Sequence, residues 1–64
     1  MITKQQAINI AKKATDEKGF KVDKVILEKN IYYIALSKGK KAYEVDIDAR
    51  TGKIIGGAGG APGN

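Results

Sequence analysis

The segment Lys41-Ala42-Tyr43-Glu44-Val45-Asp46-Ile47-Asp48 is the most informative part of this chain for predicting its fold. Its apolar and acidic residues alternate, and a period of two is typical of a β-strand with one buried face. The side that carries Tyr43, Val45 and Ile47 must meet the core, because the other side is a row of three carboxylates. An antiparallel sheet accommodates this pattern, since one of its faces can meet water.

Three further strands are predicted around this stretch, over residues 20–28, 31–37 and 53–56. Turns are expected at Lys29-Asn30, at Lys38-Gly39-Lys40 and over residues 49–52. Matching the strands to the alternation above predicts the inward-facing residues of the first two strands: Val25, Leu27, Tyr32, Ile34 and Leu36.

The N-terminal segment predicts an amphipathic helix. Thr3 and Gln6 have the spacing of a capping box, and Gly19 is expected just beyond the last turn. The apolar residues between them recur with helical spacing and are mostly small: Ala7, Ile8, Ile10, Ala11 and Ala14. The predicted fold is therefore α+β, with one N-terminal amphipathic helix packed on one face of a four-stranded antiparallel β-meander.

The chain of 64 residues is expected to form one domain over residues 1–56. Residues 57–64 contain no apolar side chain larger than alanine, so we expect a flexible glycine-rich tail or the stub of a linker. There is no cysteine, and hence no disulfide. No apolar run is long enough to span a membrane, and the first residues do not resemble a signal peptide.

The net charge of +5 comes almost wholly from lysines spread along the chain. We interpret it as favouring solubility, with weak steering toward acidic partners. Nucleic-acid binding is disfavoured, because only Tyr33 among the three tyrosines is expected to be exposed, and the acidic row on its face would repel phosphate.

Catalytic and metal chemistry are not expected. The chain has no His or Cys, so its lone serine, Ser37, lacks a general base. Asp46 and Asp48 share a face of one strand, but two carboxylates without further oxygen ligands make a poor calcium site. We therefore predict no enzyme activity, no cofactor and no metal.

The outer sheet face is the candidate binding surface. Its apolar members form a predicted patch for a partner or for self-association, consisting of Ile26, Ile31, Tyr33 and Ala35. The alternative is that lysine stems such as that of Lys24 cover this patch, so that it binds no partner.

A structural turn is predicted from Asp48, Thr51 and Gly52.

The segment from Tyr43 to Ile55 resembles the ending of a PepSY domain, with alternating β-branched residues, Asp48, Thr51-Gly52 and then aliphatic residues. The opening from Ile2 to Ala11 is similar to the helix start of that family. The resemblance implies a single copy of a helix-on-sheet module of bacterial envelope and secreted proteins, including metallopeptidase propeptides, without catalytic residues.

The resemblance also implies an extracytoplasmic location and a protein partner, with no membrane insertion by this chain. Two functions remain open at this point. The first is a module that binds and restrains a peptidase, and the alternative is a structural interaction module of the cell envelope with no peptidase target.

Overall fold

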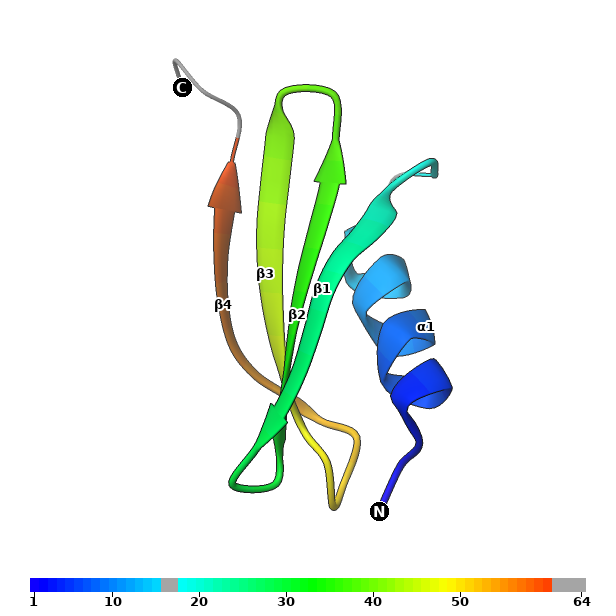
Figure 1. The fold of residues 1–64 in the computed structure, drawn as a ribbon, viewed down its shortest axis with the longest axis vertical. Helices are drawn as coiled ribbons and strands as arrows, with labels where there is room; N and C mark the ends of the chain where they lie inside the picture. Colours follow the sequence, from blue (N-terminus) through cyan, green and yellow to red (C-terminus); the bar gives the residue numbers. More distant parts are fainter. Residues whose placement is uncertain (16–17, 61–64) are drawn as a thin grey trace.

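The computed structural model describes residues 1–15 and 18–60. One helix, α1 (Lys4–Ala14), precedes four strands, β1 (Lys21–Glu28), β2 (Ile31–Lys38), β3 (Lys41–Asp48) and β4 (Ile54–Gly60). The strands form one antiparallel sheet in the order β1-β2-β3-β4, with α1 on one side of it (Figure 1). The predicted α+β meander with a single N-terminal helix is confirmed.

The start of α1 is a reciprocal capping box, as predicted. The backbone N–H of Gln6 donates to the Thr3 hydroxyl at 3.1 Å, and the N–H of Thr3 donates to the Gln6 side-chain oxygen at 2.8 Å. The predicted end was wrong, because the helix stops at Ala14 and Gly19 lies in the following loop with a φ of +91°. Thr15 terminates the helix by donating its hydroxyl to the Lys12 carbonyl at 2.7 Å, an alternative to continued helical bonding.

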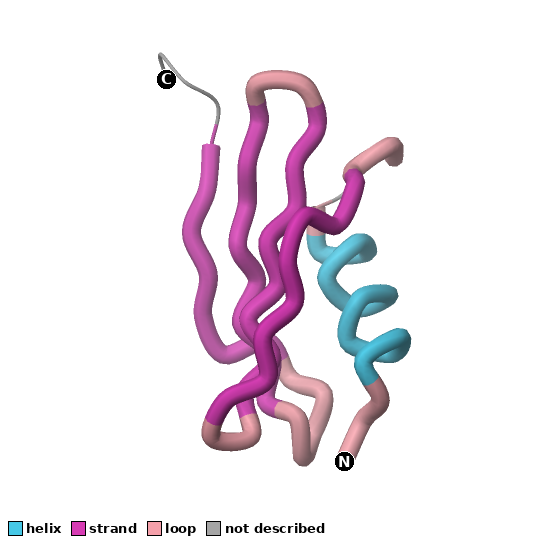
Figure 2. Tube along the Cα trace, in the orientation of Figure 1, coloured by secondary structure: helices cyan, strands magenta, loops and turns pink. Residues whose placement is uncertain are grey.

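The helix packs on β2 and β3. Figure 2 shows it as a separate layer beside the sheet. Ala7 and Ala11 are fully buried at this contact, so their small side chains let the helix approach the sheet closely. The core beneath it contains the inward residues of β2 and β3, namely Tyr32, Ile34, Leu36, Val45 and Ile47, together with Phe20 and Ala49. Tyr43 is half-buried and meets the Phe20 ring edge-on, at 5.3 Å between centroids.

A β-bulge in β1 explains the charged residues that interrupt its apolar pattern. The register shifts between Val22 and Lys24, so Asp23 is the extra residue. Val22 therefore pairs with Leu36 on the helix side, whereas Lys24 pairs with Ala35 on the outer side. Without the bulge, Val22 would share the outer face.

The last strand corrects the predicted tail. Strand β4 runs over Ile54–Gly60 rather than residues 53–56, and its glycines pair with β3 up to the Ala42–Gly60 pair. Residues 57–60 are thus part of the sheet, because ladder hydrogen bonds to β3 offset the entropy that glycine loses on ordering. The remainder of the predicted tail, residues 61–64, lies outside the described residues.

Candidate protein-binding face

The outer face of the sheet, opposite α1, brings the four predicted patch residues together. Ile26 on β1 pairs with Tyr33 on β2, and Ala35 and Ile31 lie two residues to either side of Tyr33. We call the four residues Ile26, Ile31, Tyr33 and Ala35 the open-face patch. Ile26 is 39% exposed and the other three are half-buried, so lysine stems do not cover the patch completely.

An acidic row, consisting of Glu44, Asp46 and Asp48 on β3, borders the open-face patch. The register places Ala35 opposite Glu44, Tyr33 opposite Asp46 and Ile31 opposite Asp48. Three of the seven acidic residues of a chain with net charge +5 therefore gather along one strand. This concentration makes the face locally acidic on an otherwise basic protein.

Asp46 perturbs its neighbour in the row. A hydrogen bond to Asp46, the negative charge of Asp46 and slight desolvation all raise the pKa of Glu44. The Oδ1 atom of Asp46 is buried and has no hydrogen-bond partner among the described residues. An unpaired buried acceptor is unfavourable in the folded state.

The Asp46 carboxylate leans toward β4. Gly56 pairs with Asp46, and a Cβ on Gly56 would lie 3.1 Å from the Asp46 Oδ2 atom. The missing side chain of Gly56 therefore leaves room for this carboxylate over the backbone of β4. The Oδ2 atom of Asp46 thus lies on the side of the acidic row nearest to β4.

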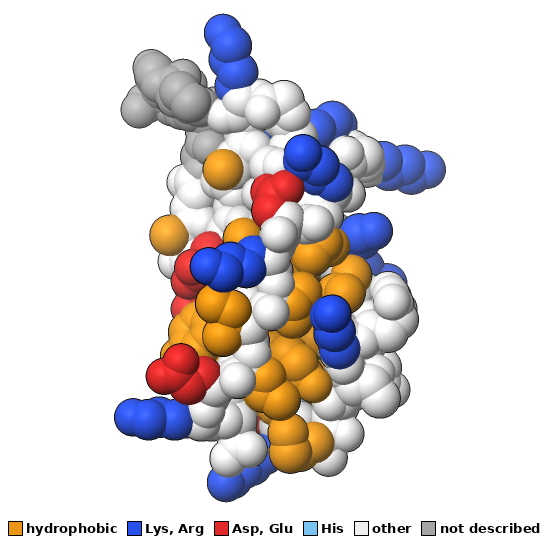
Figure 3. Space-filling model, in the orientation of Figure 1, with side chains coloured by type: hydrophobic (Ala, Val, Ile, Leu, Met, Phe, Trp, Pro, Cys, Tyr) orange, Lys and Arg blue, Asp and Glu red, His pale blue; other side chains and the backbone are white. Residues whose placement is uncertain are grey.

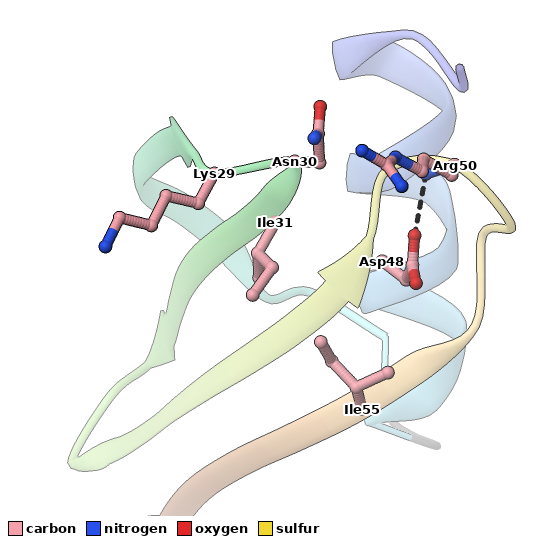
Figure 4. A pocket seen from close by; sticks show the side chains of 6 residues that line it. All are labelled: Lys29, Asn30, Ile31, Asp48, Arg50 and Ile55. Atoms are coloured by element: carbon pink, nitrogen blue, oxygen red, sulfur yellow. Dashed lines mark hydrogen bonds between the residues drawn. The ribbon is translucent and has the colours of Figure 1, made fainter.

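A shallow hollow of about 250 Å³ lies at one end of the face (Figure 4). The side chains of Ile31 and Ile55 line it on either side of Asp48, and Lys29, Asn30 and Arg50 complete it. The position of Ile55 at this hollow was not predicted. A register shift between Asp46 and Ile47 makes Ile55 the extra residue of a bulge, and its side chain is 54% exposed.

The turn after β3 fixes the position of Asp48 at this hollow. The Asp48 Oδ1 atom accepts the backbone N–H of Arg50 at 2.8 Å and that of Thr51 at 3.4 Å. The Thr51 hydroxyl accepts the N–H of Lys53 at 3.2 Å, and Gly52 has a φ of +78°. All three residues singled out for this turn thus contribute to its geometry.

A second exposed apolar strip lies on the helix side of the sheet. Leu27 faces inward, as predicted, but is 49% exposed because α1 packs over β2 and β3 rather than over β1. Hydrophobic side chains gather between β1 and α1 in the space-filling view (Figure 3). Sequence alternation identifies the face of a residue, but it does not show where along the sheet the helix lies.

Within residues 1–15 and 18–60, no three acidic, His or Cys side chains gather as a metal-binding group. No helix in the same part of the chain is both long and apolar enough to cross a membrane. What the geometry offers is an apolar centre with a charged border, an arrangement suited to protein contacts.

One helix on a four-stranded antiparallel meander, with an apolar and acidic open face, defines a small α+β module. The chain belongs to the PepSY family, because the family model described as "Peptidase propeptide and YPEB domain" matches residues 1–57. This family is a propeptide or inhibitory type of module, generally non-catalytic and typically extracellular or envelope-associated. Searches of curated proteins and of solved structures each found no match.

Proposed function

We propose that this protein is a non-catalytic module that binds and restrains a peptidase in the bacterial envelope or extracellular space. The observation that carries the proposal is the open-face patch: apolar side chains at the centre of an uncovered sheet face, in a chain of the PepSY family. Contiguous apolar surface with a charged border more often marks an interaction site than scattered apolar residues do.

Tyr33 is the proposed anchor of this contact. It lies between Ile26 on β1 and Asp46 on β3, so its ring is central to the patch. Tyrosine contributes a large contact area with a polar tip and little conformational entropy to lose. The surrounding charges then act as a rim that orients the partner and excludes water from the centre.

The test is an inhibition assay with purified extracellular metallopeptidases from bacteria. The full chain is titrated into each peptidase, and hydrolysis of a fluorogenic peptide substrate is followed together with direct binding by calorimetry. We expect saturable binding with loss of peptidase activity for at least one enzyme. Binding that leaves activity intact would favour a structural interaction module of the cell envelope, and absence of binding throughout the panel would refute the proposal.

A further inference from the structure

The two outer edges of the sheet differ in how they are protected. The β1 edge carries a bulge and charged side chains, with an ion pair between the Lys21 ammonium and Asp23 at 3.7 Å. Bulges and edge charges are the usual protection against added strands. Strand β4 has no charged residue and no proline between Ile54 and Gly60, and no described strand pairs with its outer side (Figure 1).

The small residues of β4 also leave side chains of β3 close to the outer edge of the sheet on both faces. On the outer face, Gly56 has no side chain and Ala58 has only a methyl group, beside Asp46 and Glu44 respectively. On the helix side, the Tyr43 ring lies so close to Gly59 that a Cβ on Gly59 would collide with it. A strand added to β4 would therefore meet a carboxylate on one face and an aromatic ring on the other.

From this geometry we infer that the outer edge of β4 accepts an extended segment of a protein partner in which basic and apolar residues alternate. The main chain of the segment would continue the sheet, as in other cases of strand addition. Basic side chains facing outward would cross Gly56 and Ala58 to reach the Asp46 and Glu44 carboxylates. The alternate apolar side chains would face the Tyr43 ring on the helix side.

Distances between strands support this reach. Adjacent strands are about 4.8 Å apart, so the added strand would lie about 10 Å from β3. The Asp46 carboxylate already leans over Gly56 toward the edge, which shortens the remaining gap for a lysine or arginine. The Asp46 Oδ2 atom, which lies over Gly56, is the acceptor nearest to such a donor.

A second copy of this chain fits the edge less well than a basic segment does. Pairing between two β4 strands would supply no basic side chain, because the residues from Ile54 to Gly60 are all uncharged. Pairing between β4 and the β1 edge of another copy would meet the bulge at Asp23. Charge complementarity therefore selects a basic partner strand.

This inference rests on the proposed function for its biological setting, but its test does not need a peptidase. The probe is a blocked nonapeptide that alternates lysine with valine, matched with one in which glutamate replaces each lysine. Binding to the full chain is measured by calorimetry, and backbone amide exchange locates the contact. We expect slower exchange in β4 with the lysine peptide, and at least tenfold weaker binding of the glutamate peptide.

Variants of the edge sharpen this test. Asp46→Asn and Ala58→Lys should each weaken binding of the lysine peptide about two- to fivefold, as expected for exposed charge pairs. Ala58→Glu should not weaken it, and Glu28→Gln, which removes an acid near the β1 edge, should leave it unchanged. Thermal midpoints of all variants verify that they are folded.

The inference is overturned if both peptides bind equally, if neither binds, if the protection appears in β1, or if Asp46→Asn and Ala58→Lys bind as well as the wild type. A dimer in sedimentation analysis that Ala58→Lys disrupts would also overturn it, in favour of a second copy. Peptidase inhibition without peptide binding would contradict the inference about the β4 edge but leave the proposed function intact. Peptide binding without any peptidase target would contradict the proposed function but leave the inference about the β4 edge intact.

Discussion

The ring of Tyr43 on β3 lies against the backbone of Gly59 on β4, on the helix side of the sheet. A Cβ on Gly59 would lie 2.7 Å from the Ala42 carbonyl oxygen and would collide with the Tyr43 ring. The aromatic ring thus covers a glycine that contributes no side chain of its own. This contact helps to explain how a strand composed largely of glycine remains part of the sheet.

Gly59→Ala should therefore destabilise the fold. The added methyl group meets backbone atoms that cannot easily move, and overpacking of this kind costs about 1–3 kcal/mol. Gly56→Ala is the matched comparison, because its methyl would meet the Asp46 side chain, with Oδ2 at 3.1 Å, rather than the backbone. Chemical denaturation should show the larger loss for Gly59→Ala, and equal losses would argue against this packing.

The glycine strand also shows where prediction from sequence stops. The alternation in β3 and the capping box at Thr3 and Gln6 are local patterns, and both predicted the structure correctly. The order in residues 57–60 depends instead on a partner strand and on Tyr43, which are distant in sequence. Glycine has no side-chain pattern to read, so the strand resembled a flexible tail.

Gly52→Val should destabilise more than Lys53→Val. Gly52 has a φ of +78°, a conformation that costs a β-branched residue about 1–3 kcal/mol. The space beside Gly52 is not the obstacle, since a Cβ there would lie 3.6 Å from Ile2 and Ile10, an ordinary contact distance. Thermal unfolding of the two variants checks the difference, and equal midpoints would contradict the role of the turn.

Ala11→Leu should lower the thermal midpoint clearly. Ala11 is fully buried where α1 meets the sheet, so a larger side chain must push the helix outward. The expected cost of about 1–3 kcal/mol is a large part of the stability of so small a domain. Asn9→Leu, at an exposed position of the same helix, serves as the control. An unchanged midpoint for Ala11→Leu would mean that the helix does not pack as described.

Glu44→Gln should stabilise the fold at neutral pH. Because Asp46 raises the pKa of Glu44 above 4.5, the folded state holds the proton of Glu44 more tightly than the unfolded state does. The resulting contribution to stability is present below pH 4.5 and is lost as the pH rises through the higher folded-state pKa. The gain from Glu44→Gln should thus be full above that pKa and shrink to nothing below pH 4.5.

Thermal midpoints of wild type and Glu44→Gln across pH 3 to 8 measure this effect. Glu28→Gln provides the control, since Glu28 lies at the β1 edge, away from Asp46. A gain that does not change with pH would show that repulsion from Asp46 is not the cause.

Part of the candidate site could be predicted from the sequence, because strand alternation assigns residues to a face of the sheet. Alternation placed Ile26, Ile31, Tyr33 and Ala35 on one face, and the structure shows them adjacent there. Ile55 was missed because its outward position depends on a bulge, a one-residue shift that no periodic pattern displays. The exposure of Leu27 was missed because it depends on where the helix crosses the sheet.

Binding of the restrained peptidase by the open-face patch is the step on which the proposed function depends. Its most direct test compares the Kd of the peptidase complex for wild type and for the double variant Tyr33→Ser with Ile31→Thr. Leu27→Ser is the control, since it removes an exposed apolar side chain from the helix side of the sheet. We predict that the folded double variant binds about 10- to 100-fold more weakly, as expected when a central anchor is lost, whereas the control binds as the wild type does. A double variant that folds normally and keeps the wild-type Kd would contradict the account.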